Sequence, residues 1–179
     1  MVALRSTSQG PVRRQLRVMV DANVLIAGTV WPRWSNEVLQ HARRGDFQIV
    51  LSPLVIRQAR HRVATRFPNY INDLDTALQA ISPKIVSDPT AAQVTRNATL
   101  SRDVTDVPIA LAAIKAKAYC LISEDKDLTV QDETTAQLRQ QLKIMTSGKF
   151  LREVMGWTSE ELERVRGRLW HDLPAPQTA

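Results

Sequence analysis

Cysteine, histidine and long apolar runs are scarce in this chain of 179 residues. The single cysteine, Cys120, cannot form a disulfide within the chain, and its apolar surroundings predict an unreactive core thiol. His41, His61 and His171 have no spacing typical of a zinc site. No apolar run approaches the roughly 20 residues of a membrane span, and the first 16 residues lack the apolar stretch of a secretory signal. These absences predict a cytoplasmic protein without zinc or membrane association.

The chain also lacks the motifs of several common phosphate-binding folds. It has no glycine-rich phosphate loop, which disfavours a P-loop enzyme or a dinucleotide enzyme. A phospho-receiver domain would need an aspartate after a middle strand, and Leu51, Ser52 and Pro53 offer none there.

Positive charge is in excess and is unevenly distributed. Lys and Arg number 24 against 18 acids, which gives a net charge of +6. Residues 1–20 contain four arginines and no acid, and residues 33–68 contain seven arginines against two acids. Arginines grouped in this way fit a surface for nucleic-acid phosphates, with Arg57, Arg60 and Arg62 as candidates. A solvated basic surface explains the charge equally well.

Strand-like and helix-like segments alternate along the chain. Ser35 is predicted to cap a helix that Gly45 ends, Ser52-Pro53 opens another, and Thr158 stands at capping-box spacing before Glu161. The alternation predicts an α/β fold with a mostly parallel central sheet covered on both faces. Strands are predicted at residues 16–20, 47–51, 84–87, 119–123 and 142–146, and further helices up to residue 81, at 105–117 and at 134–140.

Two aspartates fall at the carboxyl ends of predicted strands, where such folds form their ligand crevice. Asp21 ends the first strand, and Asp125 follows the strand at residues 119–123 with Asp127 close behind. Asp21 is bracketed by seven apolar residues, so its carboxylate needs a pairing, hydrogen-bonding or metal partner. Asn23 can donate a hydrogen bond to such a carboxylate and orient it. Taken singly, these acids are explained equally well as turn caps or solvated loop residues.

Asp106 is a third acid with an inward orientation. On a helical wheel it shares the apolar stripe of Ile109, Ala110 and Ala113. The positive end of a helix stabilises an acid there, and an ordinary N-cap is the alternative role. Carboxylates brought together raise one another's pKa, and a hard divalent cation such as Mg²⁺ or Mn²⁺ removes that penalty. Such an ion supports phosphodiester hydrolysis.

Several segments together resemble the PIN-domain nucleases, and more narrowly the toxin components of bacterial toxin–antitoxin systems. The resemblance runs in order over about residues 16–152, so we expect a basic arm at 1–15, a PIN-like domain at 16–152, a helical extension at 153–172 and a tail at 173–179. It implies a three-layer α/β/α sandwich, Mg²⁺- or Mn²⁺-dependent endoribonuclease activity, RNA as substrate, an antitoxin protein partner and a homodimer. The segments are residues 18–28, Ser52-Pro53, residues 102–108 and residues 122–128.

Residue by residue, the resemblance assigns the metal-binding and catalytic roles to Asp21, Asp106 and Asp125. Asp127 is an occasional metal helper, and Asn23 and Ser123 support the acids. One position departs from the family, because the usual glutamate after the second strand is replaced by Gln58, and residues 47–72 contain no acid. Glutamine keeps a carbonyl oxygen but brings no charge. An inactive PIN-like module that binds nucleic acid or a protein is therefore the alternative function.

The remaining features concern the tryptophans and the end of the chain. Trp31, Trp34, Trp157 and Trp170 are a candidate set for stacking on bases, although packing is the favoured role. The helix predicted from residue 158 to 170 can dock on the domain, pair in a dimer or receive a partner, and docking is favoured.

Overall fold

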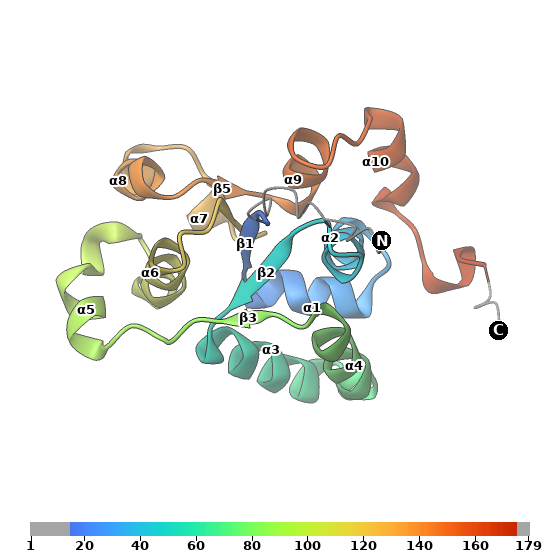
Figure 1. Ribbon diagram of the computed structural model, residues 1–179, viewed down its shortest axis with the longest axis horizontal. Helices are drawn as coiled ribbons and strands as arrows, with labels where there is room; N and C mark the ends of the chain where they lie inside the picture. Colours follow the sequence, from blue (N-terminus) through green and yellow to red (C-terminus); the bar gives the residue numbers. More distant parts are fainter. Residues whose placement is uncertain (1–14, 175–179) are drawn as a thin grey trace, which may run out of the picture.

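The computed structural model describes residues 15–174 and contains a five-stranded sheet between two layers of helices (Figure 1). All pairings are parallel, as the sequence predicts, and the strand order is β3-β2-β1-β4-β5. The arm and the tail, apart from residues 15, 173 and 174, lie outside the described residues. The strands are β1 (Arg17–Val20), β2 (Gln48–Leu51), β3 (Lys84–Ile85), β4 (Cys120–Ile122) and β5 (Ile144–Met145).

The helices divide between the two faces of the sheet, as right-handed crossovers require. One group follows β1 and β2, and the other follows β3 and β4, on the opposite side in Figure 1. The first group is α1 (Ala22–Val30), α2 (Trp34–Arg43), α3 (Pro53–Arg66) and α4 (Ile71–Ile81), and the second is α5 (Ala91–Arg96), α6 (Val107–Lys115), α7 (Lys126–Thr129) and α8 (Glu133–Gln141). Short 3-10 turns lie at η1 (Pro68–Tyr70), η2 (Ala98–Leu100), η3 (Val104–Asp106) and η4 (Trp170–Asp172).

The central strands are apolar on both sides because both faces are covered. Val18, Met19 and Val20 are fully buried, and so are the three residues of β4. Such continuous apolar runs are typical of parallel sheets between helix layers. Cys120 is among these buried residues, and burial raises the pKa of its thiol to about 12, which confirms the prediction of an unreactive core thiol.

The helix starts predicted at Ser52 and Thr158 are confirmed. The start predicted at Ser35 and the end predicted at residue 170 are wrong, since the last α-helix ends at Arg166. The Ser52 hydroxyl accepts a hydrogen bond from the Val55 N–H at the start of α3. Ser35, in contrast, is not the cap of α2, because the helix begins one residue earlier with Arg33 at the N-cap position. The Ser35 hydroxyl is buried and lies 3.0 Å from the hydroxyl of Ser147, so it joins two helices instead.

The chain ends in an extension that packs beside α2. Helix α9 (Ser147–Glu153) follows β5 within the range predicted for the domain, and α10 (Ser159–Arg166) lies in the predicted extension, with the Thr158–Glu161 capping box formed at its start. Docking of this extension on the domain is confirmed, because Trp34 of α2 donates its indole N–H to the Leu162 carbonyl of α10. No helix within residues 15–174 has the length and apolar character needed to cross a membrane.

Candidate functional site

The register of β1 and β4 brings Asp21 and Ser123 together. Val20 pairs with Ile122, so the next residue of each strand emerges at the same carboxyl edge, where the strand order reverses. The Ser123 hydroxyl donates to Asp21 Oδ2 at 2.9 Å and accepts from the Asp125 N–H at 3.0 Å. Asp21 is 5% exposed and Ser123 is fully buried. This serine therefore fixes the Asp21 carboxylate and connects it to the Asp125 backbone.

Asp106 enters the same edge from the start of α6. It occupies the N-cap position, but its side chain makes no capping hydrogen bond. The residue is 7% exposed, and its buried Oδ2 has no hydrogen-bond partner among the described residues. Asp106 is therefore not an ordinary capping residue, and a buried carboxylate oxygen without a partner is costly unless something else binds it.

Electrostatic coupling shows that the acids share one region. Burial first, and then the negative charges of Asp125, Asp103, Asp21 and Asp127, raise the pKa of Asp106 to about 7. The pKa of Asp21 is also raised, chiefly by burial, while its hydrogen bond from Ser123 opposes the rise. Clustered carboxylates with raised pKa values are typical of a functional site.

Asp125 and Asp127 are held in more exposed positions at the start of α7. Asp125 caps this helix, because its Oδ1 accepts the Asp127 N–H at 2.9 Å. Arg102 lies 3.4 Å from Asp127 and 3.2 Å from Asp132. The Asp127 carboxylate is thus paired with Arg102, a residue for which the sequence predicts no role. Arg102 stands next to Asp103 in the sequence, but its approach to α7 depends on the fold.

The prediction that Asn23 orients a carboxylate is wrong for the described structure. Asn23 Oδ1 accepts a hydrogen bond of 2.6 Å from Arg62 Nη1 instead. The positive charge of Arg62 also lowers the pKa of Asp21, so the guanidinium lies near the acids. Gln58 is half-buried one turn before Arg62 on α3, and residues four apart share a helix face. The helix face that carries Gln58 therefore brings a cation to the acid edge.

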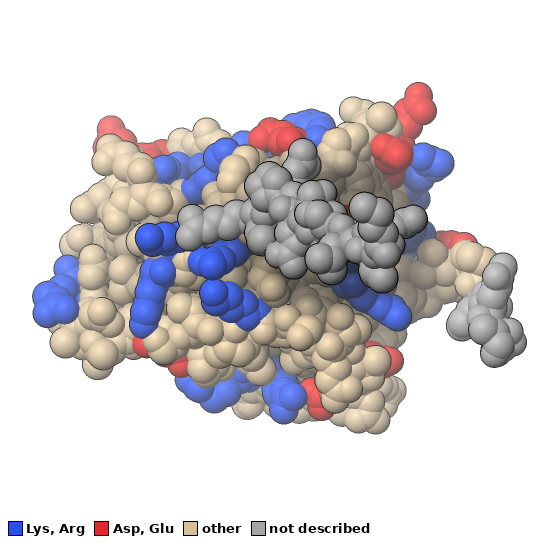
Figure 2. All heavy atoms as spheres, viewed as in Figure 1, with Lys and Arg blue, Asp and Glu red and all other residues tan. Residues whose placement is uncertain are grey.

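Arg57 and Arg60, the other candidate phosphate ligands, have acidic neighbours. Arg57 lies 3.4 Å from Asp88, and Arg60 lies 2.7 Å from Asp75. Pairs between exposed side chains are weak, so phosphates can compete for these arginines. In Figure 2, basic side chains group near the middle of the face in view and recur along its lower edge, where Figure 1 draws α3.

The carboxylates suit a divalent ion chemically, but they do not form a closed cage. No group of three His, Cys, Asp or Glu side chains within residues 15–174 is arranged to hold a metal ion. Mg²⁺ is commonly held by only one or two carboxylates, with waters and substrate phosphates as its other ligands. The unpartnered Asp106 oxygen close to Asp21 fits that open kind of site.

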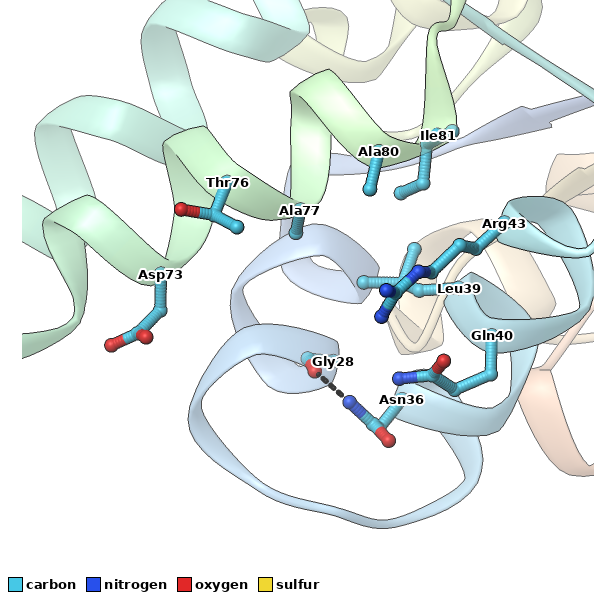
Figure 3. A pocket seen from close by; sticks show the side chains of 10 residues that line it. All are labelled: Gly28, Asn36, Leu39, Gln40, Arg43, Asp73, Thr76, Ala77, Ala80 and Ile81. Atoms are coloured by element: carbon cyan, nitrogen blue, oxygen red, sulfur yellow. Dashed lines mark hydrogen bonds between the residues drawn. The ribbon is translucent and has the colours of Figure 1, made fainter. Parts of the chain in front are cut away.

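A separate pocket of about 200 Å³ lies between α2 and α4 (Figure 3). Asn36 crosses one side of it and donates to the Gly28 carbonyl oxygen at 2.7 Å. Arg43 and Asp73 are the charged residues of its lining. None of the clustered aspartates contributes to this lining, so the pocket is distinct from the acid edge.

The protein is thus an α/β/α sandwich with a parallel sheet, and its acidic site lies at the edge of the sheet where the strand order reverses. A family model described as PIN domain matches residues 17–127, more than half of the chain, and the chain belongs to this family. PIN domains are generally nucleases.

The comparisons with other proteins support the fold. The crystal structure of PAE2754 from Pyrobaculum aerophilum is similar with a TM-score of 0.54 and 16% identity, over 79% of this chain and 97% of that one. Similarity at this identity shows the fold alone. No curated protein matches the chain.

Proposed function

We propose that this protein is a Mg²⁺- or Mn²⁺-dependent endoribonuclease of the toxin–antitoxin type. The single observation that carries the proposal is Asp106, whose buried carboxylate oxygen lacks a partner among the described residues while the charges of nearby carboxylates raise its pKa. Evolution of a stable core would favour an apolar residue there, since an unpaired buried acid costs free energy. A bound cation makes the arrangement favourable.

Asp21 and Asp106 are the proposed ligands, with Asp125 completing the acidic site and Asp127 assisting at its rim. Ser123 holds Asp21 in place through their hydrogen bond. A divalent ion supplies an activated water and stabilises charge on the phosphodiester oxygens when bound. Arg62, beside Asn23 at the edge of the site, is placed to attract a substrate phosphate.

Single-stranded RNA incubated with Mn²⁺ or Mg²⁺ tests this function. We expect cleavage that EDTA abolishes and that Asp106→Asn lowers by about 100-fold or more, because the variant loses a carboxylate ligand. Asp103→Asn is the matched control, since Asp103 is an exposed neighbour whose carboxylate accepts the Thr105 N–H, and it should cut normally. Cleavage that survives both EDTA and Asp106→Asn would contradict the proposal.

A module that binds without cutting is the second candidate. Gln58 in place of the family glutamate, and the lack of a three-residue metal group within residues 15–174, favour it. Retained RNA binding without cleavage under either metal would establish this alternative.

An antitoxin protein, a homodimer and a cytoplasmic location belong to the same proposal. They rest on the resemblance to toxin components and on the basic surface. Copurification of the protein with the product of a small neighbouring reading frame would support the partner.

A further inference from the structure

The four tryptophans have different surroundings, and three of them fasten the C-terminal extension. Trp34 Nε1 donates to the Leu162 carbonyl at 2.8 Å, Trp170 Nε1 donates to the Val30 carbonyl at 2.8 Å, and Trp157 Nε1 donates to His41 Nε2 at 2.9 Å. Trp31 differs from them, because its indole N–H donates to none of the described residues and its side chain is 37% exposed. Hydrogen bonds that fasten the extension therefore account for three tryptophans, and Trp31 takes no part in them.

Trp31 stands at the end of a short accessible track that begins beside the acids. Every residue of α1 is buried except Asn23 and Ala27, which lie one turn apart on the same side. Trp31 follows one turn later as the C-cap residue, roughly 12 Å from Asn23 at the helical rise of 1.5 Å per residue. This distance corresponds to at most about four nucleotides at the 3.4 Å spacing of a stacked strand.

A small pocket beside Trp31 reaches the loop that carries Asp125. It has a volume of about 190 Å³, and Ala27, Arg33, Trp34 and Glu124 are among the residues that line it with Trp31. Glu124 directly precedes Asp125, so one wall of the pocket is the loop that carries the acid. The volume lies below the roughly 300–1,000 Å³ of pockets for drug-sized ligands and suits a single planar group.

The indole ring has an aromatic neighbour, and Arg33 lines the same pocket. Phe67 packs against Trp31 edge to face, with ring centroids 5.4 Å apart and planes at 81°. Phe67 follows the last residue of α3. The exposed Arg62 and Arg66 stand one turn apart on this helix, and Arg62 contacts Asn23. A fixed aromatic ring among cations is the arrangement that binds single-stranded nucleic acid, since bases stack on the ring while arginines attract the phosphates.

We infer that Trp31 is a base-stacking subsite, which holds one nucleobase of a single-stranded RNA a few nucleotides from the phosphodiester at the aspartates. The inference rests on the proposed ribonuclease function and adds a requirement for unpaired bases. A paired base in a duplex cannot offer its face to the indole, so this subsite selects single strands.

Binding of a short fluorescein-labelled RNA, followed by anisotropy in EDTA, tests the subsite without any cleavage. Trp31→Leu keeps an apolar contact with Phe67 but lacks a ring face, and it should weaken binding by about fivefold or more. Trp31→Phe should retain most of the affinity. Tyr119→Leu is the matched control, because Tyr119 is 41% exposed at the opposite, amino-terminal edge of the sheet, and it should bind normally.

An abasic strand of the same length separates stacking from charge. Trp31→Leu should bind the abasic strand as the unsubstituted protein does, and an equal loss on both strands would overturn the inference. If Trp31→Leu does not fold, the fluorescence of the unsubstituted protein and of Trp31→Phe replaces it as the measurement. RNA should then quench the emission of the unsubstituted protein more strongly, and equal quenching would overturn the inference.

A parallel cleavage assay with Mn²⁺ distinguishes the two proposals. RNA cleavage together with unchanged binding by Trp31→Leu overturns the subsite alone. Base-dependent binding that requires Trp31, without cleavage, supports the subsite and refutes the nuclease activity. A protein that binds no RNA refutes both and favours a protein partner for this face.

Discussion

Asp106, a proposed metal ligand, has a buried carboxylate whose charged form costs stability. Its pKa is raised to about 7, whereas an aspartate in an unfolded chain titrates near 3.9. Between these two values the folded protein holds a proton that the unfolded chain has released. The free energy of unfolding therefore decreases as the pH rises across this range, and the loss persists above pH 7.

Replacing this carboxylate should stabilise the protein without metal. In EDTA at pH 8 we expect Asp106→Asn to raise the free energy of unfolding by about 1–3 kcal/mol, because it removes the buried charge. At pH 4 the change should be small, since Asp106 is then protonated. Urea denaturation at both pH values measures the difference. Asp103→Asn should give a clearly smaller gain, because it removes only a neighbouring charge from Asp106, while hydrogen bonds from Thr105 keep the pKa of Asp103 itself low.

Gln58 allows a test in which a carboxylate is added to the site instead of removed. A carboxylate at this position stands on the helix face that carries Arg62 toward the acids, so Gln58→Glu should raise Mn²⁺ affinity by adding a charged ligand. Gln79→Glu is the control, because Gln79 is exposed near the end of α4, at the amino-terminal edge of the sheet. Titration calorimetry measures both variants, and unchanged Mn²⁺ binding by Gln58→Glu would refute its assignment to the site.

The sequence predicts which acids meet, but not every contact that they make. Asp21 and Ser123 follow apolar strands, so a parallel sheet brings them to one edge, and the helical stripe orients Asp106 inward. The partners of Asn23 and Asp127 could not be predicted in the same way. Arg62 lies 39 residues from Asn23 and Arg102 lies 25 residues from Asp127, so helix packing decides both contacts.

At the scale of helices and strands, local patterns predict elements with one apolar face and miss those buried all round. Helix α4 shows the amphipathic spacing, with Leu74, Leu78 and Ile81 buried, and it was predicted. Helix α1 is buried along almost its whole surface and so shows no helical period. The short helix α5 was also missed, although Thr90 and Gln93 form a capping box at its start.

The tight crossing of α1 and α2 depends on Gly28. A Cβ atom there would lie 2.6 Å from Leu39 Cδ1 and 2.9 Å from the Ser35 carbonyl oxygen. Alanine favours a helix by about 1 kcal/mol over glycine, but we expect the clash to dominate and Gly28→Ala to destabilise the protein by about 1–3 kcal/mol. A Cβ at Gly167 meets no atom within 4 Å, so Gly167→Ala is the control. In thermal denaturation, Gly28→Ala should have a lower Tm than the unsubstituted protein, and Gly167→Ala should not. Equal Tm values for the two variants would contradict the close packing.

At the scale of the whole molecule, the extension closes the chain back onto its first two helices. The three indole N–H donors described above join residues more than 110 positions apart in the sequence. Arg168 adds to them, because its Nε donates to the Pro32 carbonyl at 2.6 Å and its Nη2 pairs with Glu37. Docking of the extension therefore relies on hydrogen bonds between residues far apart in the sequence. The apolar pattern of the last helix could not predict which residues they join.

The Arg168–Glu37 pair should contribute measurably to this closure. Its side chains are only 19% and 16% exposed, so removing one partner leaves the other charge poorly solvated. We expect Arg168→Met to cost about 2–3 kcal/mol of unfolding free energy, and a double-mutant cycle with Glu37→Met to give a coupling of about 1–3 kcal/mol. The exposed pair of Arg166 and Glu163, at 66% and 70%, is the matched control. Its coupling should stay below about 0.5 kcal/mol, and equal couplings from urea denaturation would show that burial adds nothing to the closing contact.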